Sequence, residues 1–107
     1  MQPLSDLAQA NGFKAIQVSK TEFVDGIGAT IGLNFVKNQV FYTTSQMVKE
    51  LGFEIKNTSG KIKARNRQDA EQQIVSQMAG SGVKAAQITG CNEYKAGEFF
   101  IKVQYIK

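Results

Sequence analysis

The sequence predicts an α+β fold in which a mostly antiparallel, hairpin-built sheet carries about three helices packed on one face. Three observations support this fold class. Segments in which apolar and polar side chains alternate, as in strands, are interspersed with short segments of helical periodicity. Turns that contain glycine separate most of these segments. Finally, 107 residues with 42% hydrophobic residues and a single proline are enough for one ordered core, so we expect residues 1–107 to form a single domain.

The first half of the chain is expected to contain two helices and three strands. Gly12 and Gly52 each follow a short segment with an apolar edge and are expected to end helices, because glycine readily adopts the left-handed conformation found there. Thr43 and Gln46 have the spacing of a capping box, which satisfies unpaired amide groups at a helix start. The expected elements are a helix at 3–11, strands at 13–20, 30–36 and 39–43, a loop at 21–28, and a helix at 44–51.

The segment 53–65 is interpreted as a β-hairpin around which the rest of the chain is arranged. Its centre, Thr58-Ser59-Gly60, consists of small residues suited to a tight turn, and the segments on either side alternate with period two. A two-residue turn would pair Ile55 with Ile62 on an apolar face. The opposite face would carry mainly basic side chains and point to solvent.

A longer helix is expected at 66–79, directly after this hairpin. Asn66 is a suitable N-cap, and Asp69 lies in the first turn, where the helix dipole favours negative charge. Ala70 and Ile74 fall on one side at helical spacing. This side is therefore expected to pack on the apolar face of the hairpin.

The end of the chain is expected to form two strands, at 83–89 and 98–106, with a loop at 90–97 between them. The last strand is rich in β-branched and aromatic residues. Alternation places Phe100 and Ile106 on the face opposite to the other apolar side chains of this strand, and one of the two faces must be core. Apolar side chains on the remaining face would form a partner-binding patch, an oligomer contact or a second core layer.

A helical segment leads through a glycine into a strand three times, at Gly12, Gly52 and Gly82. This pattern is either a threefold αββ repeat or the generic chemistry of helix ends. The unequal spacing of the three glycines favours helix-end chemistry.

The composition argues against catalysis. The chain has no histidine, which removes the usual general base and the commonest transition-metal ligand. Gly26 and Gly28 lack the third glycine and the lysine of phosphate-binding loops. No spacing typical of metal ligands occurs. We therefore expect no enzymatic activity, no catalytic residue, no bound metal and no cofactor.

The cysteine content and hydropathy suggest a cytoplasmic location. Cys91 is the one cysteine, so it cannot form an intrachain disulfide, and a lone thiol is commoner in a reducing compartment. No apolar run approaches the roughly 18 residues of a membrane-spanning helix, and the N-terminal residues do not resemble a secretion signal. No membrane association is expected.

A basic strip in the centre of the chain points to a polyanionic partner. Cations on an open sheet face can follow a phosphate backbone, so the strip predicts a module that binds nucleic acid or another polyanion. Lysines on the exposed face of a sheet also keep it soluble and blunt an edge strand, which is the competing interpretation. The strip consists of Lys56, Lys61, Lys63, Arg65 and Arg67.

A different class of function remains open. A short chain of this composition could instead be a protein-binding accessory, an inhibitor or an assembly subunit, with or without self-association. Aromatic side chains are favoured as anchors in protein interfaces. The candidates are Phe100, Tyr94 and Tyr42.

Overall fold

The computed structural model of the protein describes residues 1–20 and 30–107, and the side chains of residues 1–16 and 34–107. The predicted loop at 21–28, including Gly26 and Gly28, lies outside these residues. The described part of the chain is α+β, as predicted, with three helices and seven strands. The molecule is elongated, measuring 45 × 27 × 19 Å.

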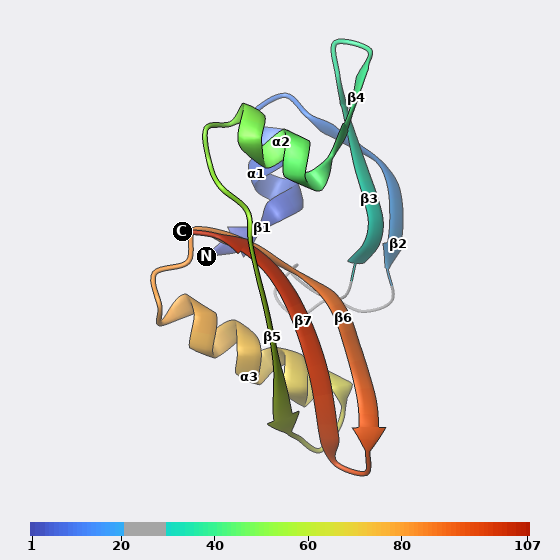
Figure 1. Ribbon diagram of the computed structural model, residues 1–107, viewed down its shortest axis with the longest axis vertical. Helices are drawn as coiled ribbons and strands as arrows, with labels where there is room; N and C mark the ends of the chain where they lie inside the picture. The colour runs from blue at the N-terminus through green and yellow to red at the C-terminus, as the bar shows by residue number, and fades with distance from the viewer. Residues whose placement is uncertain (21–29) are drawn as a thin grey trace.

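The strands form two sheets that lie towards opposite ends of the long axis (Figure 1). A four-stranded sheet has the order β1-β6-β7-β5 and is antiparallel except for the short β1–β6 pair. A three-stranded antiparallel sheet has the order β2-β3-β4. The elements are β1 (Gln2–Pro3), α1 (Leu4–Ala10), β2 (Lys14–Lys20), β3 (Thr30–Lys37), β4 (Val40–Thr43), α2 (Thr44–Glu50), β5 (Lys56–Lys63), α3 (Arg67–Ala79), β6 (Ala85–Lys95) and β7 (Glu98–Ile106).

The elements of the first half agree with the predictions except for β1, a two-residue strand that was not predicted and that overlaps the start of the helix expected at 3–11. The capping box of α2 is confirmed: the Gln46 amide donates to Thr43 Oγ1 at 3.2 Å, and the Thr43 amide donates to Gln46 Oε1 at 2.9 Å. The turn between β3 and β4 is formed by Asn38 and Gln39, whose φ angles of 52° and 66° are those of a tight hairpin turn.

The predicted hairpin at 53–65 is wrong. Residues 56–63 form one continuous strand, β5, which pairs along its whole length with β7. Thr58 and Gly60 lie in the middle of this strand, opposite Val103 and Ile101. A local turn would leave the backbone groups of β7 without this partner, so the long-range pairing of eight residues outweighs the local turn preference.

The predicted loop at 90–97 is also wrong. β6 continues to Lys95 and joins β7 through a tight turn in which Gly97 has a φ of 75°. Residues such as Asn92 and Glu93 are polar because this end of the β6–β7 ribbon is exposed to solvent. Polarity therefore reflects exposure here rather than the absence of a strand.

The helix α3 covers one face of the four-stranded sheet, as Figure 1 shows with the sheet in front of it. Its predicted cap is confirmed, since Asn66 Oδ1 accepts from the Asp69 amide at 2.8 Å. The first core lies between α3 and the sheet, where it removes apolar side chains from water. It consists of Ala70, Val75, Met78, Val83, Ala86, Ile88, Cys91, Phe99, Ile101 and Val103.

A second core lies where α1, α2 and the three-stranded sheet meet the ends of β6 and β7. Ile106 of β7 is fully buried in this core, whereas Phe100, on the same face of the strand, is only partly buried. Of the three roles expected for apolar side chains on this face, a partner-binding patch, an oligomer contact or a second core layer, Ile106 has the third. This core consists of Leu4, Ala8, Phe13, Phe35, Met47, Val48, Ala85 and Ile106.

The glycines after α1 and α2 close these helices, whereas the C-cap of α3 is Gly80, two residues before Gly82. Gly12, Gly52 and Gly82 have φ angles of 85°, 85° and 76°, in the left-handed region. The following amides of Phe13 and Phe53 donate back to the last turns of α1 and α2, at Ala8 O and Val48 O. Of the strands that follow, β2 belongs to the three-stranded sheet, whereas β5 and β6 both belong to the four-stranded sheet. The hydrogen bonds after Gly12 and Gly52 are those of helix ends, the interpretation that the unequal spacing favoured.

Among residues 1–20 and 30–107, no helix combines the length and apolar character that crossing a membrane requires.

Candidate functional site

The structure divides the predicted basic strip between two faces of the four-stranded sheet. Lys61 and Lys63 lie opposite Phe100 and Glu98 of β7, on the face away from α3, which we call the open face. Lys56 lies opposite Tyr105, whose side chain packs against the first core, so Lys56 is on the α3 side. The common basic face that the hairpin would have formed does not exist.

The two arginines at the start of α3 have different environments. Arg67 Nε lies 3.2 Å from Oε1 of Glu71, a carboxylate that is fully buried, and the Arg67 side chain is 31% exposed. Arg65 is 87% exposed, and its Nε lies 3.8 Å from Asp69 Oδ2. Arg65 is thus accessible to a ligand, whereas Arg67 compensates a buried charge.

The sequence interpretation did not include Lys102, which joins Lys61 and Lys63 on the open face. Lys102 lies on β7 between Ser59 of β5 and Gly90 of β6. A Cβ at Gly90 would be 3.8 Å from Lys102 Cβ and Cδ, so the lysine stem lies over the glycine. The alternation of β7, which places Lys102 on the same face as Phe100, is the sequence signal that could have identified it.

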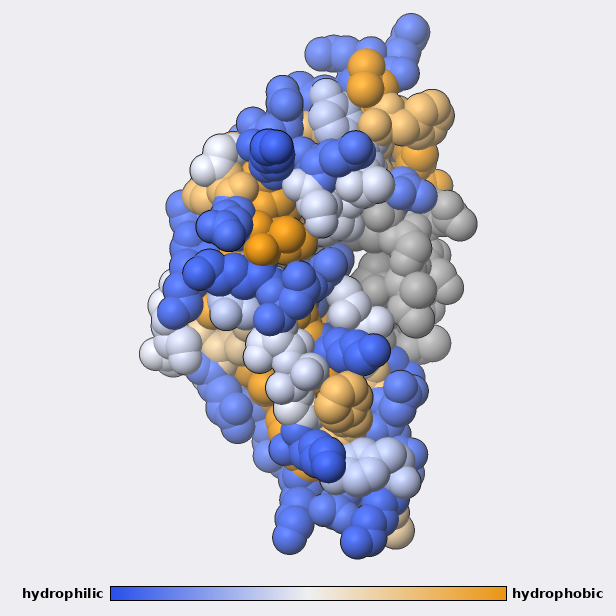
Figure 2. Space-filling model, viewed as in Figure 1, coloured by the Kyte–Doolittle hydropathy of each residue, from blue (hydrophilic) through white to orange (hydrophobic). Residues whose placement is uncertain are grey.

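Two aromatic rings lie among these lysines. Phe100 on β7 lies between Lys61 of β5 and Asn92 of β6 in the register. Tyr94 is 47% exposed, and Lys61 Nζ lies 5.4 Å from the centroid of its ring, within cation–π range. Figure 2 views this side of the molecule and shows apolar residues surrounded by hydrophilic ones over the lower part of the sheet.

The charge on the open face is predominantly positive. Its carboxylate, Glu98, is paired with Lys95, since Glu98 Oε2 lies 3.6 Å from Lys95 Nζ. Within the part of the chain that the structure describes, Lys61, Lys63 and Lys102 make no ion pair. These three ammonium groups are therefore available to an anionic ligand.

A polar depression of about 230 Å³ adjoins Lys102 on the sheet. Hydroxyl and amide side chains at its rim can hydrogen-bond to phosphate or sugar oxygens. It is lined by Asn57, Thr58, Ser59, Thr89, Lys102 and Val103.

The third predicted aromatic anchor, Tyr42, belongs to the three-stranded sheet. It is partly buried and packs edge-on against Phe13, with ring centroids 5.0 Å apart. Its neighbours Phe41 and Val40 are 72% and 51% exposed and border a groove of about 510 Å³ between β4 and α2. The sequence interpretation missed Phe41, although alternation along β4 places it on the face opposite to Tyr42.

In the described residues, no group of three or more metal-binding side chains comes together. Cys91 is buried in the first core. The expected lack of enzymatic activity stays a prediction.

Comparison of the chain with protein-family models, with curated proteins and with solved structures finds no match. Its function therefore has to be inferred from its own residues.

Proposed function

We propose that the protein is a non-catalytic binding module that contacts nucleic acid or another polyanion across the open face of the four-stranded sheet. The observation that carries this proposal is the convergence of Lys61, Lys63 and Lys102 on one exposed sheet face without ion-pair partners among the described residues. The formal net charge of +4 favours an anionic partner as well.

Three lysines on a sheet neutralise phosphates without reading bases, because base readout needs side chains that reach base edges. Binding should therefore tolerate different sequences and weaken steeply with salt, since each neutralised phosphate releases condensed counterions. Arg65, two residues after β5, is exposed but lies beside Asp69 of α3. Lys56, on the α3 side, and Arg67, paired with Glu71, contribute less. A cytoplasmic location, expected from the single cysteine, would give access to such a partner.

Titration of labelled single-stranded DNA, duplex DNA and RNA by fluorescence anisotropy, at two salt concentrations, tests this proposal. Lys61→Glu/Lys63→Glu should weaken binding at low salt by about tenfold or more and reduce the salt slope by about two units. The matched control is Lys14→Glu/Lys49→Glu, which changes two exposed lysines elsewhere and lowers the net charge equally.

The proposal is overturned if the wild type binds none of these ligands at low salt. It is also overturned if the two double variants lose the same affinity, because net charge alone would then explain binding.

A second candidate is a protein-binding accessory or self-associating subunit that uses exposed aromatic side chains. The observation that favours it is the 72% exposure of Phe41 beside the groove between β4 and α2. Phe100 and Tyr94 could serve the same role. Size-exclusion chromatography distinguishes the two candidates. Self-association that does not change with salt favours the second candidate, because contacts between apolar surfaces depend little on salt.

A further inference from the structure

We infer that Phe100 and Tyr94 are stacking platforms for nucleobases, so that the ligand of the open face is a single-stranded nucleic acid. This inference rests on the proposed function and specifies its ligand. It depends on the juxtaposition of an exposed ring, Tyr94, and a partly buried ring, Phe100, with three lysines on one sheet face that have no ion-pair partner among the described residues.

Neither hydrophobic core includes Phe100 or Tyr94. Phe99, directly before Phe100, is buried under α3 with Ile101. The side chains that β7 contributes to the first core therefore lie on the face opposite to Phe100. Phe100 and Tyr94 lie outside both cores, and Tyr94 is 47% exposed. Rings that remain accessible gain less from burial than core side chains. Phe100 is partly buried, and the exposed part of each ring is a surface on which a base can stack.

Two of the lysines are close neighbours of Phe100 in the sheet. Alternate residues on a strand lie roughly 7 Å apart, so Lys102 follows Phe100 at that distance along β7. Lys61 lies beside Phe100 on the neighbouring strand. A base stacked on Phe100 would thus have Lys61 on one side and Lys102 on another, and both could contact its adjoining phosphates. The polar depression beside Lys102 could hold a sugar or phosphate oxygen.

Lys61 contacts the Tyr94 ring, since its ammonium group lies 5.4 Å from the ring centroid. A cation–π contact at an exposed site is weak and is replaced readily by a charge-assisted contact to phosphate. Movement of Lys61 to a phosphate would uncover the Tyr94 ring for a second base. Phosphate binding and stacking would then be linked through one side chain.

These features favour a single strand over other polyanions. In a duplex the faces of the bases are stacked on one another and cannot reach a ring on a sheet surface. A polyanion without bases could use the lysines but not the rings. The surface therefore suits unpaired nucleotides.

The test compares four ligands at one salt concentration: a single-stranded oligonucleotide, an abasic strand of the same length, the corresponding duplex, and inorganic polyphosphate. The wild type should bind the oligonucleotide roughly tenfold or more tightly than the abasic strand. Phe100→Leu/Tyr94→Leu keeps apolar bulk on the strands and should remove most of this preference without any loss of polyphosphate affinity, because the lysines that bind phosphate are retained. Phe41→Leu changes an exposed aromatic side chain on β4 of the three-stranded sheet, away from the open face. It is the matched control and should behave as wild type.

Tyrosine fluorescence gives a second readout, because the chain has no tryptophan. Base stacking should quench the wild-type signal on binding, and the quenching should be lost in Tyr94→Leu.

The outcomes separate the two proposals. If oligonucleotide and abasic strand bind equally and Phe100→Leu/Tyr94→Leu changes nothing, while Lys61→Glu/Lys63→Glu still weakens binding, the stacking inference is overturned and polyanion binding stands. If no anion binds, both are overturned. Circular dichroism of each variant verifies that it is folded.

Discussion

The ion pair between Arg67 and Glu71 joins the first two turns of α3 and involves a carboxylate that is shielded from water. Glu71 is fully buried, and its Oε1 accepts from Arg67 Nε at 3.2 Å. Removing a charge from water is costly unless a partner compensates it. The neighbouring pair, Arg65 with Asp69, spans 3.8 Å and has an arginine that is 87% exposed. Pairs of this kind contribute little because water screens them.

We predict that Arg67→Ala lowers the free energy of unfolding by about 1.5–3 kcal/mol, because a buried carboxylate loses a charged hydrogen-bond partner. Arg65→Ala is the matched control at the same helix end, and its effect should stay within about 0.5 kcal/mol. Urea denaturation followed by circular dichroism measures both. Equal losses in the two variants would contradict the structural role given to Arg67.

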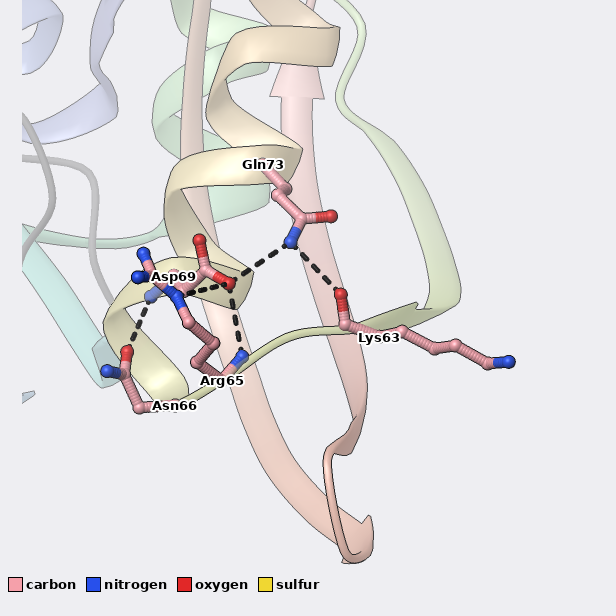
Figure 3. Close-up of polar contacts among 5 residues, drawn as sticks. All are labelled: Lys63, Arg65, Asn66, Asp69 and Gln73. Carbon is pink, nitrogen blue, oxygen red and sulfur yellow. Dashed lines mark hydrogen bonds and ion pairs between the residues drawn. The ribbon is translucent and has the colours of Figure 1, made fainter.

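At the scale of elements, the end of β5 is tied to the start of α3 by a network of side-chain contacts (Figure 3). Asp69 Oδ2 accepts from the Arg65 amide at 3.1 Å, and Gln73 Nε2 donates to the Lys63 carbonyl at 3.0 Å. These contacts hold the strand that carries Lys61 and Lys63 against the helix. β5 is also an edge strand, where lysines discourage pairing with other chains. The binding titration distinguishes that protective role from a role in ligand binding.

We predict that Asn66→Ala destabilises the protein by about 1 kcal/mol, because the Asp69 amide at the start of α3 loses its acceptor. Asn66→Asp, which keeps an acceptor oxygen, should restore most of the stability. Gln68→Ala, an exposed change in the same helical turn, should have little effect. Chemical denaturation provides the free energies. An Asn66→Ala variant as stable as Gln68→Ala would show that the cap contributes nothing.

At the scale of the whole molecule, β6 and β7 contribute to both cores. Ala85 and Ile106 belong to the second core, whereas Ile88 and Val103 of the same two strands belong to the first. Loss of one core would therefore disturb the strands on which the other depends. This continuity supports the prediction that residues 1–107 are one cooperative domain.

We predict that Ile106→Ala, in the second core, destabilises the protein by about 2–5 kcal/mol and exposes Cys91, in the first. The reaction rate of the Cys91 thiol with a thiol reagent should rise together with the loss of global stability. Val40→Ala, at a side chain that is 51% exposed, is the control and should leave the rate unchanged. Full protection of Cys91 in a destabilised Ile106→Ala variant would indicate two units that unfold independently.

The sequence by itself determined the elements whose signals are local. The capping box of Thr43 and Gln46, the Asn66 cap and the glycines after α1 and α2 act through hydrogen bonds within a few residues, so their effect is visible in a short window. The alternation of the last strand likewise showed which of its side chains share a face. These features established the α+β class and the boundaries of most helices.

Only the tertiary structure decided which strands are neighbours, and with this the composition of the open face. The turn preference of Thr58-Ser59-Gly60 is local, but β5 gains eight paired residues by lying straight along β7. This pairing separates Lys56 from Lys61 and Lys63. It places Lys61 opposite Phe100 and Lys63 opposite Glu98, on the same face as Lys102. The physical reason is that period two specifies the faces of a strand, whereas its partner is selected by backbone hydrogen bonds and burial between residues far apart in the chain.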